Sequence, residues 1–127
     1  MAVCGSALKP RKSRGEPGHS HENGSACRFI AATVASVLGA DAGDVIGPMR
    51  GCASTAFARG AAMYLAHVTL AMTFSEVGRH FGRDRTTVAH ACARIEDARE
   101  NEKVDQLIGR LEDLLEGWRR IVLVAQR

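Results

Sequence analysis

Apolar residues recur at helical spacing along most of the chain from about residue 25 onward. The clearest run lies near the C-terminus, where apolar side chains return every three or four residues from Val104 to Val122. This spacing places them on one face of a helix, so the sequence predicts a long amphipathic helix that begins near Lys103. A shorter stripe with the same spacing consists of Val88, Ala91, Cys92 and Ile95.

Glycine ends the first predicted helix, and a short helical turn follows it. The apolar residues between Phe29 and Leu38 recur at helical spacing and stop at Gly39, which is a typical C-cap. Residues 41–46 are predicted to form a short turn of helix whose two apolar side chains, Val45 and Ile46, face inward.

An alanine-rich segment predicts the next helix. Ser54 or Thr55 caps it, and helix-forming residues continue to about Leu70. It offers three large apolar side chains to the core, Met63, Leu65 and Val68. No segment alternates apolar and polar residues as a half-buried strand does, so we expect an all-α fold.

Residues 1–25 contain many polar and basic residues and almost no apolar side chains. Such a segment buries too little surface to offset the entropy lost on ordering. We therefore expect a disordered basic N-terminal tail over residues 1–25 and one helical domain over residues 26–124.

The segment from Phe74 to Arg99 has the order of elements found in a helix-turn-helix. Thr73 or Ser75 begins a short helix that ends at Gly82, and Asp84 caps a longer helix that runs to about Glu100. In such a motif the second helix enters the major groove, and its N-terminal residues contact base edges. The face opposite the apolar stripe carries the candidate contact residues Arg85, Thr86, Thr87, Ala89, His90 and Arg94.

Residues 82–97, GRDRTTVAHACARIED, resemble the signature of the C-terminal DNA-binding domain of the bacterial replication initiator DnaA, whose pattern is roughly GGRDHTTVLHACRKIE. Residues 62–82 are similar to the family's preceding helices. The resemblance implies a helix-turn-helix fold of the Trp-repressor and DnaA C-terminal type that binds a short, non-palindromic duplex box. By position, the implied contact residues are Arg83, Asp84, Arg85, Thr86, Thr87 and His90. A polar helix start also fits ordinary solvation, but the motif match favours DNA contact.

Three departures from the family pattern bear on DNA binding. Arg85 replaces the family's histidine, and one glycine of the turn is missing. The family's basic loop before the preceding helix corresponds here to residues 49–54, where only Arg50 is basic, with Arg59 on the next helix as a second candidate contact. Fewer phosphate contacts should weaken binding and its salt dependence, because each neutralised phosphate contributes about −0.9 to the salt slope. The basic tail over residues 9–14 could supply the phosphate contacts that the loop lacks, which is a hypothesis.

Composition and charge narrow the class of protein. The formal net charge is only +3, but basic residues outnumber acidic ones in the tail and in residues 79–99, as in a nucleic-acid footprint. No GxxxxGK[ST] phosphate loop is present, so we expect a stand-alone DNA-binding domain without a nucleotide cofactor rather than a complete initiator. No stretch of about 18 apolar residues spans a membrane and no signal peptide is evident, so we expect a protein of the bacterial cytoplasm, associated with the nucleoid.

The sequence gives little support to an enzyme or a metal protein. The four cysteines are widely spaced and are interpreted as free thiols. Cys4, His19, His21 and Cys27 lack the short pair spacings of a zinc site. We therefore expect no metal, no cofactor and no catalytic residues.

Two functional hypotheses remain open. The first is a sequence-specific binder of a DnaA-box-like site that regulates replication initiation or transcription. The second is an interaction or oligomerisation protein that kept the fold but lost useful DNA affinity with its basic loop. The long apolar stripe of residues 103–124 is expected to pack mainly on the first helix, with a homodimer through the same residues as the alternative.

Overall fold

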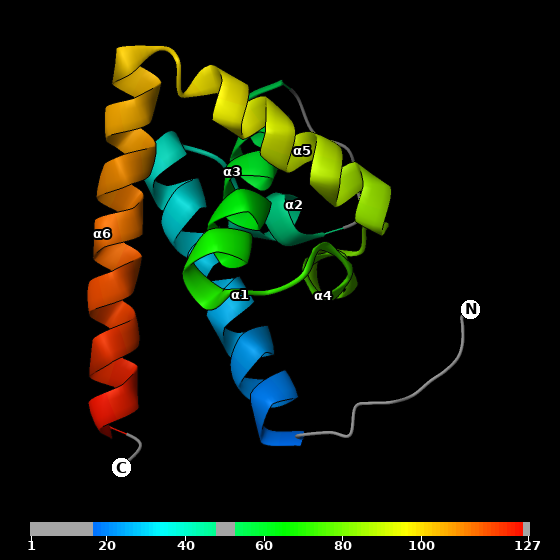
Figure 1. Ribbon diagram of the computed structural model, residues 1–127, viewed down its shortest axis with the longest axis vertical. Coiled ribbons are helices and arrows are strands. Elements are labelled where there is room, and N and C mark those ends of the chain that lie inside the picture. Colours follow the sequence, from blue (N-terminus) through cyan, green and yellow to red (C-terminus); the bar gives the residue numbers. More distant parts are fainter. Residues whose placement is uncertain (1–16, 48–52, 126–127) are drawn as a thin grey trace.

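The computed structural model describes residues 17–47 and 53–125, and all regular elements in this part of the chain are helices (Figure 1). The predicted all-α fold is confirmed. In chain order the helices are α1 (Pro17–Leu38), α2 (Ala42–Ile46), α3 (Ala53–Leu70), α4 (Phe74–Phe81), α5 (Arg85–Ala98) and α6 (Glu102–Ala125).

Helix α3 is the central helix of the fold and contacts each of the other five, α1 and α5 most extensively. Nearly every side chain from Ala58 to Ala66 is buried, so α3 has no polar face over this stretch. A helix that is apolar all round is stable only when its neighbours cover every side. Its small residues permit this: a Cβ at Gly60 would lie in ordinary contact with Ile95 of α5, 3.7 Å away.

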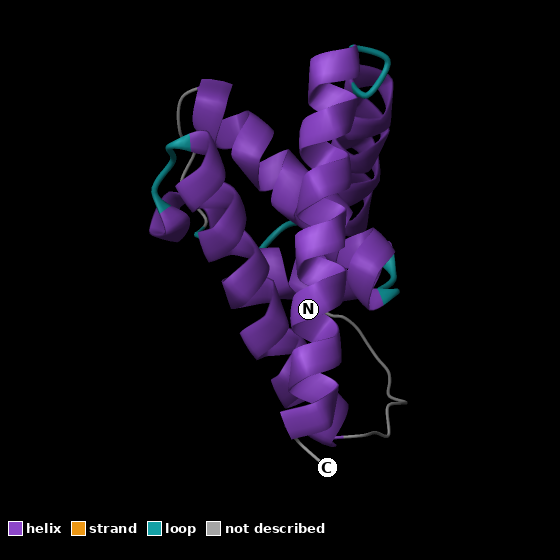
Figure 2. Ribbon diagram, turned by 90° about the vertical axis from the view of Figure 1, so that its left-hand side faces the viewer, coloured by secondary structure: helices purple, strands orange, loops and turns teal. Residues whose placement is uncertain are grey.

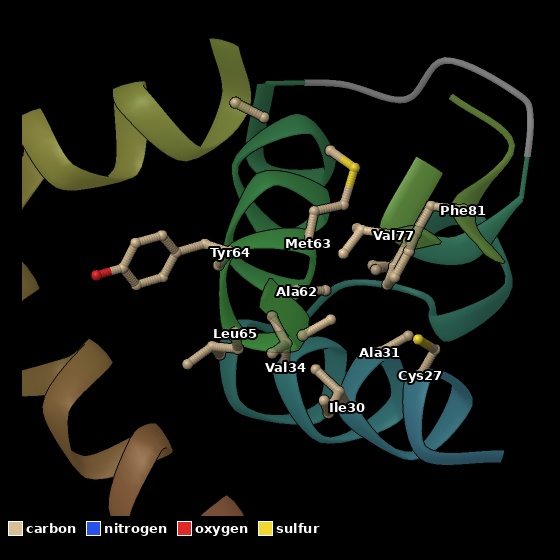
Figure 3. Packing of buried hydrophobic residues seen from close by; sticks show 14 of the residues in the cluster. Cys27, Ile30, Ala31, Val34, Ala62, Met63, Tyr64, Leu65, Val77 and Phe81 are labelled. Atoms are coloured by element: carbon tan, nitrogen blue, oxygen red, sulfur yellow. The ribbon is translucent and has the colours of Figure 1, made fainter. Parts of the chain in front are cut away.

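The core lies where α1, α3 and α4 meet, and α5 and α6 close the other sides. Figure 3 shows Ile30 and Val34 of α1 beneath α3, and Val77 and Phe81 of α4 on the side of Met63. Tyr64 points the other way, toward the region between α5 and α6 (Figure 3).

The first helix begins earlier than the sequence pattern indicated. Residues 17–25 belong to α1, so the first helix includes nine positions that the sequence pattern assigned to the tail. Proline is tolerated at a first helical position, and extending an existing helix costs little once residues such as Ala26 and Cys27 are packed in the core. Residues 1–16 lie outside the described part, and the domain boundary at residue 26 stays a prediction.

Two details of α3 also differ from expectation. The helix begins at Ala53, so Ser54 and Thr55 lie in its first turn instead of at the cap. Val68 is exposed and not part of the core. The predicted inward position of Val45 in α2 is confirmed.

The expectation that α6 packs mainly on the first helix was wrong: its first half packs on α3, and it reaches α1 through its tryptophan. Ile108, Leu111 and Leu115 are buried against the core. Further along, the Trp118 ring stacks on Phe29 of α1 with 4.4 Å between ring centroids. Figure 2 shows the ends of α1 and α6 extending below the rest of the bundle.

Candidate nucleic-acid interface

The connection from α4 to α5 is a tight turn built on two glycines. Gly82 ends α4 in the left-handed conformation, with φ 66°, as the sequence predicted for this position. The Arg83 amide then donates to the Gly78 carbonyl at 2.9 Å. A Cβ at Gly78 would lie 2.3 Å from the Arg83 carbonyl oxygen. The turn therefore brings the two backbones closer than any side chain at residue 78 would permit.

Both helices of the motif have well-formed N-caps. Thr73 and Glu76 form a reciprocal capping box at the start of α4, with bonds of 2.8 and 3.1 Å. Asp84 caps α5, and its carboxylate accepts from the Thr87 amide at 2.7 Å. Hydrogen bonds from the Thr87 amide and hydroxyl hold the pKa of Asp84 below its ordinary value. The recognition helix thus begins at a fixed place with an ionised cap.

The predicted division of α5 into two faces is confirmed. Its buried residues are Val88, Ala91, Cys92 and Ile95, and they pack on α3 and α4. The opposite side of the N-terminal half is exposed and carries Arg85, Thr86, Thr87, His90 and Arg94. Because Thr86 and His90 are four residues apart, they lie in one row along the centre of the exposed face.

Charge is unevenly distributed along α5. Arg85 and Arg94 project from its N-terminal two thirds, whereas the acidic residues Glu96 and Asp97 lie in its last turn. The helix dipole and its free amides add positive potential at the same N-terminal end. An anionic partner is therefore favoured at the start of the helix and disfavoured at its end.

Arg83 is folded back onto the turn instead of projecting from it. Its guanidinium donates to the carbonyls of Phe81, Gly82 and Gly47, at 3.1, 3.2 and 3.2 Å. The third bond spans 36 residues and ties the helix-turn-helix to the segment that follows α2. This geometry gives Arg83 a role in positioning the turn.

Arg59 occupies a structural position. Its side chain is only 8% exposed, and it donates to the carbonyls of Asp44 and Val45 at 2.7 and 3.2 Å. Burial and the nearby Arg83 lower the pKa of Arg59, while Asp44 opposes this shift. The interpretation of Arg59 as an exposed DNA contact does not fit this burial. The sequence pattern could not separate the two roles, because an arginine at a helix start serves either one.

Several predicted features lie outside the described residues. Arg50 and most of the loop that precedes α3 fall in residues 48–52, and the basic tail falls in residues 1–16. Of the four hypothetical zinc ligands, Cys4 also falls outside, whereas His19, His21 and Cys27 lie in α1, where Cys27 is a buried free thiol. Within residues 17–47 and 53–125 no group of three or more metal-ligating side chains is found, and no helix there is long and apolar enough to cross a membrane.

Comparison with known proteins agrees with this geometry. A family model described as the bacterial dnaA protein helix-turn-helix matches residues 27–95, more than half of the chain. This chain belongs to that family. The helix-turn-helix of α4 and α5 is accordingly a DNA-binding motif of the DnaA type.

The relatives of this DnaA-type domain are much longer proteins. The chromosomal replication initiator protein DnaA of Bifidobacterium animalis subsp. lactis (strain AD011) is 42% identical over 69 residues, which are 54% of this chain and 12% of that protein. A crystal structure of a DNA replication initiation factor aligns with a TM-score of 0.70 and 28% identity, over 79% of this chain and 31% of the other. A replication initiator DnaA bound to AMPPCP and single-stranded DNA aligns at 0.68 and 28%, over 82% and 33%.

Two glycines of this DnaA-type site were missed from the sequence. Gly47 offers the carbonyl that Arg83 binds, and Gly78 allows the close approach of the turn. A glycine inside a helical pattern is a signal for such an approach, so Gly78 could have been found. Gly47 could not, because a backbone carbonyl leaves no mark in the sequence.

Proposed function

We propose that this protein binds duplex DNA in a sequence-specific manner, with the N-terminal half of α5 in the major groove of a DnaA-box-like site. Through that site it regulates replication initiation or transcription. The observation that carries the proposal is the exposed face of Arg85, Thr86, Thr87, His90 and Arg94, held on a helix whose cap and turn are fixed.

Each side chain on this face suits a different part of the duplex. Arg85 offers two parallel donors to guanine, and the threonine methyl groups match the thymine methyl group. Arg94 and the α5 amides suit phosphates. Asp84 accepts from the Thr87 amide through one carboxylate oxygen, and a carboxylate at this position also suits a cytosine amino group.

Two of the residues that the sequence suggested as DNA contacts are not in the proposed contact set. Arg83 and Arg59 act indirectly, because their guanidinium groups hold the ends of the turn and of α2. Direct contacts outside α5 are then left to Arg50 and to the basic tail, both proposals that rest on sequence. A protein with this function resides with the chromosome in the bacterial cytoplasm and needs no nucleotide.

The test is a fluorescence-anisotropy titration of a DnaA-box duplex and a scrambled duplex at two salt concentrations. The variant is Thr86→Ala/Thr87→Ala, which removes two hydroxyls and two methyl groups from the exposed face without lowering helix propensity. The matched control is Ser36→Ala, an exposed hydroxyl on α1. Preference for the box in the wild type and in the control, lost in the double variant, supports base readout by α5.

Two results of the same titration would contradict the proposal. Equal, strongly salt-dependent binding to both duplexes would mean contact with the backbone only. An absence of binding at either salt would favour the second candidate, an interaction protein that works through α6. The specific observation behind that candidate is the exposed apolar end of α6.

A further inference from the structure

The C-terminal half of α6 carries an apolar stripe that nothing in the described chain covers. Leu115 is the last buried residue of the helix. Beyond and beside it, Leu114 is 49% exposed and Ile121 is 68% exposed, and Val124 is exposed to a similar extent. This part of α6 also lies outside residues 27–95, the segment that matches the DNA-binding family.

These exposed residues share one side of the helix. Leu114 and Ile121 are seven residues apart and therefore stand two turns apart on one face. Gly117 lies between them, and a Cβ there would meet no atom within 4 Å. Arg110, one turn before Leu114, ends the stripe. The face is thus a short apolar ridge with a gap at its middle that admits close approach of another helix.

We propose that this stripe binds the same stripe of a second copy of the protein, with the two helices antiparallel. An interface between identical copies is self-complementary about a two-fold axis, and the open Gly117 lies near that axis. Leu114 of one copy then lies beside Ile121 of the other. Leu114 and Ile121, which are exposed in the monomer, each gain an apolar neighbour in the pair.

Charge selects the antiparallel arrangement. Asp113 and Arg120 are exposed, seven residues apart, and so lie along the same flank of the stripe. In the antiparallel pair Asp113 of each copy faces Arg120 of the other, which forms two complementary pairs at once. In a parallel pair this flank would face the partner's opposite flank, so Asp113 would not meet Arg120. Glu116 and Arg119 interact within the helix at 3.8 Å and do not oppose this arrangement.

The position of α5 determines what such a dimer can do. In Figure 1 α6 lies along the left edge of the molecule, and the N-terminal end of α5 points to the right edge. A dimer through α6 therefore turns its two recognition helices away from each other. If each copy binds DNA as proposed above, the dimer bridges two separate DNA segments.

The dimer should be weak. Two short stripes bury less than the roughly 1,200 Å² typical of stable interfaces. We expect dimerisation in the micromolar range, strengthened when both copies bind the same DNA molecule, because tethering raises their effective concentration.

The first test is sedimentation velocity of the full chain from low micromolar to several hundred micromolar protein. The variant Ile121→Arg should raise the dimer dissociation constant about tenfold or more, as loss of a central apolar contact does. The matched control Val37→Arg changes a valine on α1 that is 50% exposed and should dimerise like the wild type. A wild type that stays monomeric over the whole range, or an Ile121→Arg variant that dimerises like it, overturns the proposal.

A charge exchange tests the orientation. Asp113→Arg alone places two arginines opposite each other and should weaken the dimer, whereas Asp113→Arg/Arg120→Asp should restore it. Failure of the double variant to recover overturns the antiparallel arrangement. Circular dichroism and Trp118 fluorescence confirm that each variant is folded.

Bridging is tested with a duplex that carries two boxes and a duplex that carries one. Ile121→Arg should bind the single-box duplex as the wild type does, but it should lose the compact two-box complex in a gel-shift assay. If no form binds the single box, the proposed function fails, while sedimentation still decides on the dimer. Wild-type bridging that persists in Ile121→Arg would overturn the role of α6.

Discussion

At the scale of single residues, side chains of one type serve different purposes according to what lies around them. Arg85 projects freely from the start of α5, Arg83 folds onto three carbonyls, and Arg59 is buried against α2. All three were candidates for DNA contact from the sequence. Only the surroundings of each guanidinium show which of them is free to reach a base.

Arg85 should set base preference at one position of the binding site. A bidentate arginine–guanine contact contributes roughly 1–3 kcal/mol of discrimination, or about fivefold to a hundredfold in affinity. Arg85→Ala should lose that amount at one position, and Arg85→His should shift the preference toward the box of the histidine-bearing relatives. Selection of binding sites from a random duplex pool measures both. Identical selected sites for wild type and Arg85→His would show that Arg85 contacts only the backbone.

Asp84 should make the stability of the fold depend on pH. Its pKa is lowered in the folded state, so its contribution is present above the unfolded value of 3.8 and is lost as the pH falls through the lower folded value. Asp84→Asn keeps a capping side chain that does not titrate. In urea unfolding, the stability advantage of the wild type over Asp84→Asn should shrink as the pH is lowered from 7 to 3. A constant difference between the two would contradict the ionised cap.

At the scale of elements, the recognition helix is placed by the turn before it more than by its own sequence. Gly82 supplies a left-handed residue, Gly78 a close backbone contact, and Arg83 a clamp to Gly47. The clamp connects the turn to the end of α2, and residues 48–52 with Arg50 follow directly. The start of α5 and the end of α2 are therefore held in a fixed relative position.

Gly78→Ala should displace the turn that positions α5. The added Cβ would lie 2.3 Å from a backbone oxygen, so α4 or the turn must move. We expect a loss of about 2–4 kcal/mol in unfolding free energy, within the range of severe core substitutions, and a loss of DNA binding. The control is Gly109→Ala on α6, whose nearest neighbour is 3.9 Å away, and it should gain up to about 1 kcal/mol. Thermal and urea denaturation compare them, and equal stability would contradict the close approach.

At the scale of the whole molecule, a few long-range polar contacts attach the last helix to the rest. The Arg99 guanidinium bonds to Asp105 at 2.7 Å, to Glu112 at 3.1 Å and to the Tyr64 hydroxyl at 3.1 Å. It thus links the end of α5 to α6 and to the central α3. At the other end of this packing, Arg119 donates to the Thr69 carbonyl at the end of α3.

Arg99→Ala should loosen α6 without unfolding the helix-turn-helix. Hydrogen bonds to charged groups contribute about 1.5–3 kcal/mol each at most, and exposed ion pairs under 1 kcal/mol, so we expect a loss of about 1–3 kcal/mol. The fluorescence of Trp118, the single tryptophan of the chain, reports whether α6 stays stacked on α1. Glu116→Ala, which removes only a pair within α6, is the control. An unchanged unfolding midpoint by Trp118 fluorescence would contradict this role of Arg99.

The sequence by itself determined the helical class, the buried stripe of α5 and the helix caps Thr73, Gly82 and Asp84. These follow from local rules, because helical periodicity and capping depend on residues within one or two turns of each other. The family motif added the proposed face of DNA contact for the same reason, since RDRTTVAH is one contiguous segment.

Only the tertiary structure decided what depends on distant neighbours. The start of α1 at Pro17, the burial of Arg59 and the clamp from Arg83 to Gly47 each involve atoms far apart in the chain or in the packed core. The apolar stripe of α6 shows the same limit. Its period left open whether the bundle or a second copy covers the last turns, and in the structure the bundle covers Leu111 and Leu115 and leaves Ile121 exposed, because a small domain ends before the helix does.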